Sequence, residues 1–355
     1  MILTSRSGRT SYRYLTGATV VTLALAGCGG GAGDGGSSTN SGAGSGAESF
    51  YEGKTIDLVV PYEPGGGYDT YARALAPHLE ECLGATVVVQ NEPGAGGLLA
   101  TNKTFSASPD ELRLQVVNSV GAVSAQMAGD DGAQFDMTEF SALGRIVATV
   151  SAVAVSPDSD VQDFQQFIDE GGTVRFPSTG PGANDYITPN VLAAIYGFST
   201  EMITGYQGSG EARLALIQGD GDAYVQSWDS MLDAIESGEV KAILVASEES
   251  VEQLPDVPTL ADYEPATDNG DQLREDLAAL EATGRGVVAP PELPEDRLTE
   301  LRDAYNCAFE KQELLDELEK QGRPLGLQSG EEWQKTLETA LNTSEEFQTV
   351  IADSF

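Results

Sequence analysis

The sequence predicts an α/β protein of two domains, and three observations support this fold class. Short apolar, β-branched runs alternate with helical segments along most of the chain, as in layered folds with mostly parallel strands. Three of these runs end in a glycine-rich turn that opens directly into a helix. The 355 residues, 40% of them hydrophobic, are enough for one large or two medium-sized domains with their own cores.

The first third of the chain predicts three strands and two helices. The strands are expected at Thr55–Pro61, Thr86–Gln90 and Leu112–Asn118, and the second of them is expected to be buried. The first helix has apolar residues at helical spacing, namely Tyr68, Ala72, Leu75 and Leu79. The second helix follows the turn Asn91–Gly97 and reaches about Ala107.

The rest of the chain continues the same alternation. Further strands are expected at Val147–Val155, Thr173–Pro177, Ala223–Gln226, Val240–Ala246 and Gly286–Ala289. Further helices are expected at Val161–Ile168, Ala183–Tyr196, Glu295–Leu318 and Glu331–Ile351. Ser329 and Glu332 form a capping box that opens the last of these helices. The acidic segment Thr267–Thr283 is interpreted as a surface insertion.

The chain is strongly acidic, with 56 Asp and Glu residues against 19 Lys and Arg, for a formal net charge of -37. This excludes a general nucleic-acid binder, which needs a basic surface, and it argues against electrostatic docking on an anionic membrane. The spread of the acidic residues favours a halophilic host, because concentrated salt screens charge repulsion within about 3 Å. An ordinary acidic exported protein is the alternative. With three Cys and one His, we expect no metal site and no cofactor.

The N-terminus has the features of a lipoprotein export signal. Residues 1–14 carry three arginines, and the apolar stretch 15–26 that follows is too short to span a bilayer. Leu25–Cys28 resembles the lipobox of secreted lipoproteins, in which the chain is cleaved before the cysteine and the cysteine is lipidated. We therefore expect a signal peptide at 1–27, a lipidated Cys28 and a flexible Gly/Ser linker to residue 50. The mature protein would carry a net charge of -40, because the three arginines are removed, and would be anchored to the outer face of the cytoplasmic membrane.

Two other cysteines, Cys82 and Cys307, remain in the mature chain. In an oxidising compartment they allow one pairing. Either they form a disulfide or both are small buried residues, and the sequence leaves these alternatives open.

The three glycine-rich turns form the candidate binding site. A strand that ends in such a turn presents backbone N–H groups and the positive end of a helix dipole, which suit a carboxylate or a phosphate. Pro64–Asp69 lacks the third glycine of a dinucleotide fingerprint, and the sequence has no Gly-Lys-Ser/Thr loop. Any one of these turns also fits a tight connection without a ligand. Together they favour a cleft between two lobes over a single nucleotide-binding fold.

Six segments carry motifs in a recognisable order. They are Lys54–Arg73, Val87–Gly97, Phe176–Ala183, Tyr206–Gly210, Leu254–Leu260 and Val287–Pro294. Together they resemble the substrate-binding proteins of tripartite tricarboxylate transporters, the TctC or Bug family. The resemblance implies a type II periplasmic-binding-protein fold of two α/β lobes joined by a hinge, with lobe 1 at 51–150 plus 276–355 and lobe 2 at 151–275. It also implies a monomer that closes over a small carboxylate and delivers it to a large and a small membrane permease subunit.

The residues expected to contact the ligand lie largely in these segments. They are Tyr62, Gly65, Gly66, Gly67, Asp69, Thr70, Ala95, Gly96, Gly97, Ser178, Thr179, Gly182, Ala183, Asn184, Tyr206, Gly208, Ser209 and Gln226. The chain departs from the family at Pro109–Leu112, where the family has Pro-Asp-Gly-Tyr, and at Gln226, where it often has Asp. Citrate and other di- or tricarboxylates, acidic amino acids and aromatic acids are all compatible ligands.

Several alternatives stay open. Asp69 either caps its helix or contacts the ligand, and Tyr206 either contacts the ligand or belongs to the core. An enzyme is not expected, because Ser178 and Ser209 have no histidine to activate them; His78, the one histidine, is predicted at the surface of the first helix. A ligand-sensing subunit of a membrane signalling protein would use the same fold.

Overall fold

The structure is a computed structural model that describes residues 49–355. The expected signal peptide, Cys28 and nearly all of the expected linker lie outside the described residues. Within residues 49–355, no helix is long and apolar enough to cross a membrane. In the same part of the chain, no group of three or more His, Cys, Asp or Glu side chains could hold a metal ion.

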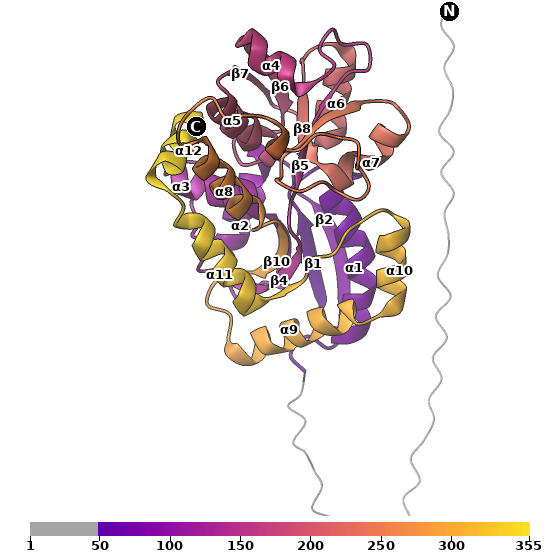
Figure 1. The fold of residues 1–355 in the computed structure, drawn as a ribbon. Helices are drawn as coiled ribbons and strands as arrows, with labels where there is room; N and C mark the ends of the chain where they lie inside the picture. Colours follow the sequence, from indigo (N-terminus) through magenta and orange to yellow (C-terminus); the bar gives the residue numbers. More distant parts are fainter. Residues whose placement is uncertain (1–48) are drawn as a thin grey trace, which may run out of the picture. The chain divides into compact units, whose positions relative to one another are not determined.

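A six-stranded sheet, in the order β11-β4-β10-β3-β1-β2, is the centre of the first lobe (Figure 1). Its strands are β1 (Thr55–Val60), β2 (Thr86–Asn91), β3 (Arg113–Asn118), β4 (Ser141–Val147), β10 (Arg285–Ala289) and β11 (Gln328–Ser329). The helices that accompany it are α1 (Gly67–Leu83), α2 (Leu98–Ser106), α3 (Ser119–Ala128), α9 (Glu295–Phe309), α10 (Gln312–Lys320) and α11 (Gly330–Leu341). We call this sheet and these helices lobe 1.

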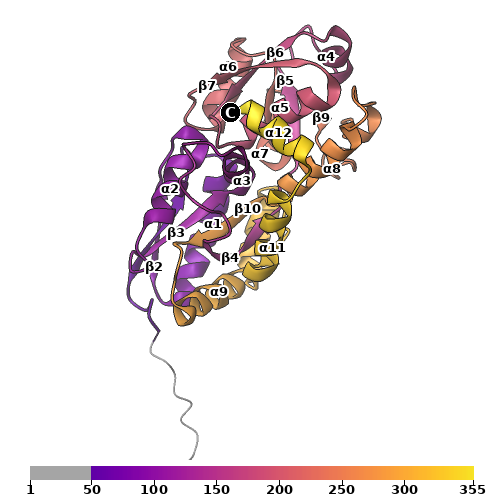
Figure 2. The ribbon, with the colours of Figure 1, turned by 90° about the vertical axis from the view of Figure 1, so that its left-hand side faces the viewer.

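Two smaller sheets form the second lobe, one of three strands in the order β8-β5-β9 and one of two strands, β6-β7. Their strands are β5 (Ser151–Val155), β6 (Thr173–Ser178), β7 (Ser199–Thr204), β8 (Tyr224–Ser227) and β9 (Lys241–Val245). The helices are α4 (Phe164–Glu170), α5 (Asn184–Tyr196), α6 (Ser209–Gln218) and α7 (Trp228–Glu236). We call this part lobe 2. Two more helices, α8 (Gly270–Glu281) and α12 (Glu345–Ser354), pack on α5 and α3, and Figure 2 shows α12 beside α5.

The chain crosses between the lobes twice, and the two crossings lie side by side. The first crossing joins β4 to β5, and the second joins α8 to β10. The backbone N–H of Thr149, in the first crossing, donates to the carbonyl of Glu281 at 2.9 Å. Gly284, in the second crossing, has a φ of +60°, and a Cβ there would lie 2.0 Å from the carbonyl oxygen of Val147. Only glycine therefore allows the two crossings to approach so closely.

One apolar core extends through both lobes on the side of α8. It includes Val123 of α3, Leu192 of α5 and Leu277 of α8, all fully buried. Trp333 of α11 belongs to the same core, and its indole N–H donates to the carbonyl of Thr283 at 2.8 Å. The crossing segments are therefore held by packing as well as by backbone hydrogen bonds.

The acidic segment Thr267–Thr283 contains helix α8, so its interpretation as a surface insertion is wrong. Leu273, Leu277 and Leu280 recur at helical spacing and are buried against the core. Composition alone does not reveal this apolar face, because one helix can carry acidic residues on its exposed face and apolar residues on its buried face.

Each predicted strand overlaps a strand of the structure, but the predicted direction, bounds or burial is wrong in several cases. Three strand pairings are parallel and five are antiparallel, so the expectation of mostly parallel strands is wrong. At β5 and β10 the direction changes because the chain arrives from the other lobe and enters the sheet from the opposite end. The expected strand Val147–Val155 begins too early: residues 148–150 form the first crossing, β5 begins at Ser151, and Val147 is the last residue of β4. Strand β2 lies at a sheet edge and is half exposed, not buried as expected.

Both long C-terminal helices are divided. The expected helix Glu295–Leu318 forms α9 and α10, and the expected helix Glu331–Ile351 forms α11 and α12. The side chain of Ser344 accepts a hydrogen bond from the N–H of Phe347 and so begins α12 with its own cap. Helical spacing of apolar residues continues across the breaks, which explains why periodicity alone missed them. The capping box that begins α11 is confirmed.

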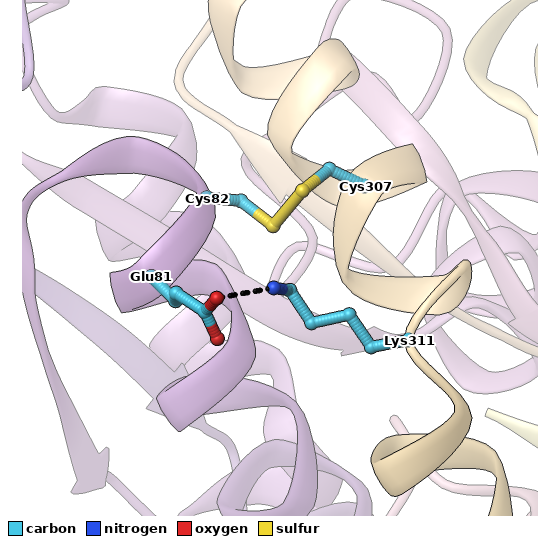
Figure 3. The surroundings of a disulfide bond; sticks show 4 residues. All are labelled: Glu81, Cys82, Cys307 and Lys311. Carbon is cyan, nitrogen blue, oxygen red and sulfur yellow. Dashed lines mark ion pairs between the residues drawn. A yellow bond between two sulfur atoms is a disulfide. The ribbon is translucent and has the colours of Figure 1, made fainter.

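Cys82 of α1 and Cys307 of α9 form a disulfide bond with a Cα–Cα distance of 6.1 Å (Figure 3). The ammonium of Lys311 lies 2.7 Å from the carboxylate of Glu81, beside this bond. The two cysteines are 225 residues apart in the sequence. Closing so long a loop stabilises the fold by about 5 kcal/mol at most in the chain-entropy model. The bond ties the C-terminal part of lobe 1 to its N-terminal helix.

Candidate ligand-binding cleft

A cavity of about 30 Å³ lies where the two lobes meet. Lobe 1 lines it with Tyr62, Gly66, Gly67, Tyr68 and Arg285. Lobe 2 lines it with Thr179, Ala183, Asn184, Asp185, Ser209, Tyr224, Gln226 and Ser227. This volume has room for about two water molecules but not for an organic acid. The structure therefore shows the lobes in close contact.

Four strand-to-helix junctions surround the cavity. They lead from β1 to α1, from β6 to α5, from β7 to α6 and from β8 to α7. The N-cap residues directly before these helices are Gly66, Ala183, Gly208 and Ser227, and within the described chain no N-cap side chain accepts a hydrogen bond from its helix. Their first-turn N–H groups and the positive ends of their dipoles are therefore directed to the same region.

Arg285 is the positively charged residue of the cavity, and hydrogen bonds to residues of α7 hold its guanidinium in place. Its guanidinium donates to the carboxylate of Asp229 at 2.9 Å and to the hydroxyl of Ser230 at 3.1 Å. It also lies over the ring of Tyr68, with 4.7 Å between the guanidinium carbon and the ring centre. Burial opposes the ionisation of Asp229, but Arg285 and Arg323 lower its pKa on balance. The side chain of Arg285 thus has a set position at the wall of the cavity.

Asp185 is the negatively charged residue of the cavity. Its carboxylate accepts hydrogen bonds from the hydroxyl of Ser178 at 2.8 Å and from the hydroxyl and backbone N–H of Thr179 at 3.1 Å. Burial nevertheless raises the pKa of Asp185 to about 6. The carboxylate is therefore mostly ionised at neutral pH and protonated below pH of about 6.

Four buried polar atoms at the cavity have no hydrogen-bond partner within residues 49–355. They are the hydroxyl oxygens of Tyr68 and Tyr224, Oε1 of Gln226 and Nε of Arg285, and all four residues line the cavity. A buried polar atom without a partner costs about 1–3 kcal/mol. A polar ligand that pairs with these atoms would recover that cost, which is the property of a prepared binding site.

The family described as "Tripartite tricarboxylate transporter family receptor", TctC, matches residues 71–351. The chain belongs to this family. The resemblance noted in the sequence is thereby confirmed.

Three relatives illustrate the family and its fold. The protein BugT of Bordetella pertussis (strain Tohama I) is 29% identical over 217 residues, which are 60% of this chain and 66% of BugT. The structure of the periplasmic binding protein BugD has a TM-score of 0.71 at 21% identity, covering 86% of this chain and 98% of BugD. MatC from Rhodopseudomonas palustris, solved with bound malate, has a TM-score of 0.70 at 21% identity, and the match covers 84% of this chain and 99% of MatC. The expected periplasmic-binding-protein fold is confirmed.

In this TctC-family receptor the residues expected to contact the ligand fall into three groups. Those that line the cavity are Tyr62, Gly66, Gly67, Thr179, Ala183, Asn184, Ser209 and Gln226. Gly65 and Gly208 line a wider hollow of about 300 Å³ that shares Gly66 and Ser209 with the cavity. The others lie outside both spaces, namely Asp69, Thr70, Ala95, Gly96, Gly97, Ser178, Gly182 and Tyr206.

Asp69 holds the first turn in shape. Its carboxylate accepts from the N–H of Gly65 at 2.9 Å, from Nε of Arg73 at 2.9 Å and from the amide of Asn91 at 3.0 Å. Burial opposes its ionisation, yet these hydrogen bonds lower the pKa of Asp69. The side chain positions Gly66 and Gly67 without lining the cavity itself.

The second and third glycine turns pack against each other. A Cβ on Gly96 would lie 2.6 Å from the backbone nitrogen of Gly182 and 2.7 Å from the carbonyl oxygen of Gly180. The hydroxyl of Tyr62 donates to the carbonyl of Gly96 at 2.8 Å. Tyr206 packs against the apolar core of lobe 2. Gly96, Gly182 and Tyr206 therefore bring the lobes together or support them without lining the cavity, whereas Tyr62 both joins the lobes and lines it.

Sequence reasoning missed five lining residues. They are Tyr68, Asp185, Tyr224, Ser227 and Arg285. Tyr68 and Asp185 directly follow residues that were expected at the site, so extending each motif by one position would have found them. Arg285 is the first residue of the buried strand β10, which is an unusual place for a charge. Its partner Asp229 is 56 residues away in the sequence, so no local motif links the two.

Proposed function

We propose that this receptor is an extracytoplasmic solute-binding protein that captures a small carboxylate between its lobes and delivers it to a membrane permease of one large and one small subunit. The observation that carries this proposal is the convergence of four uncapped helix N-termini and Arg285 on one cavity between the lobes, within the described residues. Backbone N–H groups and a guanidinium are the groups that bind carboxylates most strongly. MatC, which has the same fold and was solved with malate, supports this choice of ligand.

Our proposal for the location of the receptor rests on the sequence of the N-terminal segment. We propose that residues 1–27 are removed during export and that Cys28 receives the lipid that anchors the protein to the outer face of the cytoplasmic membrane. The linker up to residue 50 would give the folded part freedom to reach the permease as a monomer.

Binding by closure agrees with the energies involved. A micromolar ligand requires about 8 kcal/mol. One helix N-terminus contributes about 0.3–1 kcal/mol to an anion, so the open site would bind weakly. Closure adds hydrogen bonds from the opposite lobe and removes water.

We propose that the hinge lies in the two crossing segments, at residues 148–150 and 282–284. The first of these segments includes residue 150, where the sequence predicts a lobe boundary. The second boundary, expected at residue 275, falls inside helix α8, so we place it at the end of that helix.

A pair of glycine variants tests the site. Gly66 has a φ of -81°, which other residues adopt freely, but a Cβ there would lie 3.0 Å from Oγ of Ser209. Gly66→Val should therefore fill the cleft and weaken carboxylate binding at least tenfold. Gly172→Val is the matched control, because a Cβ there meets no described atom within 4 Å.

The measurement is titration calorimetry with citrate, malate, glutarate, glutamate and benzoate in about 2 M salt, where surface repulsion is screened. The proposal requires that at least one acid binds the wild type, that Gly172→Val keeps this affinity and that the acid is recovered unchanged. If no acid binds, the proposed function is wrong. If Gly66→Val binds the acid as tightly as the wild type, the site is elsewhere. We expect weaker binding in about 0.1 M salt, because the strongly acidic chain then repels an anion.

A further inference from the structure

The cavity offers hydrogen-bond acceptors as well as donors. A site for a plain carboxylate needs only donors, because carboxylate oxygens accept hydrogen bonds and do not donate them. Of the residues that line this cavity in the described chain, two are charged, and they carry opposite signs: Arg285 from lobe 1 and Asp185 from lobe 2.

The donor set is centred on Arg285. Two of its nitrogens are used by Asp229 and by the hydroxyls of Ser227 and Ser230, whereas Nε has no partner within residues 49–355. Arg285 is 2% exposed, so this unpaired Nε–H is buried at the cavity wall. Its guanidinium also lies beside Gly67, since a Cβ on that glycine would be 3.0 Å from the Nη1 atom. The charge of Arg285 and the positive end of α1 therefore act at the same place, which suits a carboxylate.

The acceptor set comes from lobe 2. Oε1 of Gln226 has no donor in the part of the chain that the structure describes. Asp185 is 5% exposed and receives its hydrogen bonds from two residues of its own turn, Ser178 and Thr179. An ionised carboxylate has about four acceptor positions, so it accepts a further donor from the ligand. A second carboxylate placed here would instead meet a like charge in a region with little water.

The charges around the cavity balance before any ligand binds. Arg285 and Arg323 are positive, and Asp229 and Asp185 are negative, and all four side chains are at least nine-tenths buried. A ligand of two carboxylates without a donor would bring two uncompensated negative charges to this site. A ligand with both a carboxylate and an ammonium group adds no net charge, or one negative charge if it has a second carboxylate, which the helix N-termini can offset.

We propose that the preferred ligand is an amino acid, held with its carboxylate at Arg285 and its ammonium group at Asp185 and Oε1 of Gln226. This inference rests on the proposed function, since it names the class of carboxylate that the same site takes. The hydroxyls of Tyr68 and Tyr224 complete the hydrogen bonds to the carboxylate.

Matched acids test the inference. Each set has one carbon skeleton with an ammonium group, a hydroxyl or a hydrogen at the carbon next to the carboxylate: alanine, lactate and propionate; aspartate, malate and succinate; glutamate, 2-hydroxyglutarate and glutarate; phenylalanine, phenyllactate and phenylpropionate. Titration calorimetry measures the affinity of each acid. Within the set that binds most tightly, we expect the amino acid to bind at least tenfold more tightly than the unsubstituted acid, and the hydroxy acid to have an intermediate affinity.

Three variants assign this preference to the acceptors. Asp185→Asn should reduce the ratio of the affinities for the amino acid and the unsubstituted acid from at least ten to about one. Gln226→Leu should also lower this ratio. Asp222→Asn is the control, because Asp222 is in lobe 2, pairs with Arg175 and does not line the cavity. If Asp185→Asn fails to fold by circular dichroism, Gln226→Leu decides the question.

The outcomes are distinct. If the acid with hydrogen binds as tightly as the amino acid, or if Gln226→Leu leaves the ratio unchanged, the inference is wrong while the proposed function stands. If no member of any set binds, the proposed function fails and the inference fails with it.

Discussion

Two of the glycine contacts between the lobes differ in what surrounds them. At Gly96 the backbones of the two lobes meet directly, because a Cβ there would lie 2.6 Å from the nitrogen of Gly182. At Gly66 and Gly67 the opposite lobe presents the side chains of Ser209 and Ser230, and the cavity lies beside them. We call these the closed contact and the cavity contact. The comparison teaches that glycines in similar strand-to-helix turns can serve two purposes: one allows close approach of the lobes, and the other leaves N–H groups at a cavity, where we propose that the ligand binds.

The largest expected effect is at the closed contact. Gly96→Val places a side chain into the backbone of the opposite lobe and also forces valine into a φ of +64°. We expect ligand binding to fall more than 100-fold, because the lobes no longer reach each other, with a larger radius of gyration in small-angle X-ray scattering.

Gly129→Val separates strain from obstruction in that experiment. Gly129 has a similar φ of +65°, but a Cβ there meets no described atom within 4 Å. It should lower the melting temperature through backbone strain and keep the affinity. Equal losses of affinity in both variants would show that the closed contact has no special role.

The second effect concerns the crossings between the lobes. Glu281 is 3% exposed, and its carboxylate accepts from the N–H of Ser151 at 3.1 Å and from the hydroxyl of Thr188 at 3.3 Å. Burial raises its pKa from 4.5 to about 7. The folded state therefore holds a proton that the unfolded chain releases above pH of about 4.5. This stabilisation is complete below that pH and is lost as the pH rises to about 7, a change of the order of 3 kcal/mol.

Chemical denaturation between pH of about 5 and 7.5 measures this loss. The free energy of unfolding should fall less steeply with pH in Glu281→Gln than in the wild type. Glu310→Gln, on an exposed helix end, should keep the wild-type slope. A slope that is identical in all three proteins would mean that Glu281 does not titrate in this range. In Glu281→Gln the free energy of unfolding would still fall with rising pH up to a pH of about 6, because burial also raises the pKa of Asp185 to about 6.

The smallest expected effect comes from removing single tyrosine hydroxyls, and it tests whether the ligand occupies the cavity. The hydroxyls of Tyr224 and Tyr305 are both buried and have no partner in the described part of the chain, but only Tyr224 lines the cavity. Removing an unpaired buried hydroxyl should stabilise the free protein by about 1 kcal/mol in both Tyr224→Phe and Tyr305→Phe, seen as a higher melting temperature.

Only Tyr224→Phe should also weaken ligand binding, by about tenfold, because a hydrogen bond to a charged group contributes about 1.5–3 kcal/mol. Calorimetry with the acid that binds best provides the measurement. Unchanged affinity in Tyr224→Phe would place the ligand away from β8.

Sequence patterns predicted the local structure of the site well. The strand at Thr55–Val60, the glycines that follow it and the apolar face of α1 were all visible, because each depends on residues close together in the chain. The same holds for the turn before α5, where Thr179 and Asn184 were expected and do line the cavity. The helix break at Ser344 was missed, because a serine among polar residues carries a weak signal unless its cap is seen.

The sequence by itself determined the family, the α/β class and the strand-to-helix turns that we propose as the binding site, since motifs and hydrophobic periodicity are properties of short segments. Only the tertiary structure decided which turns meet each other and which enclose a cavity. It also decided that Arg285 and Asp185, 100 residues apart in number, face that cavity from opposite lobes. The physical reason is that such a juxtaposition depends on packing between distant segments, and packing leaves no periodic trace in the sequence.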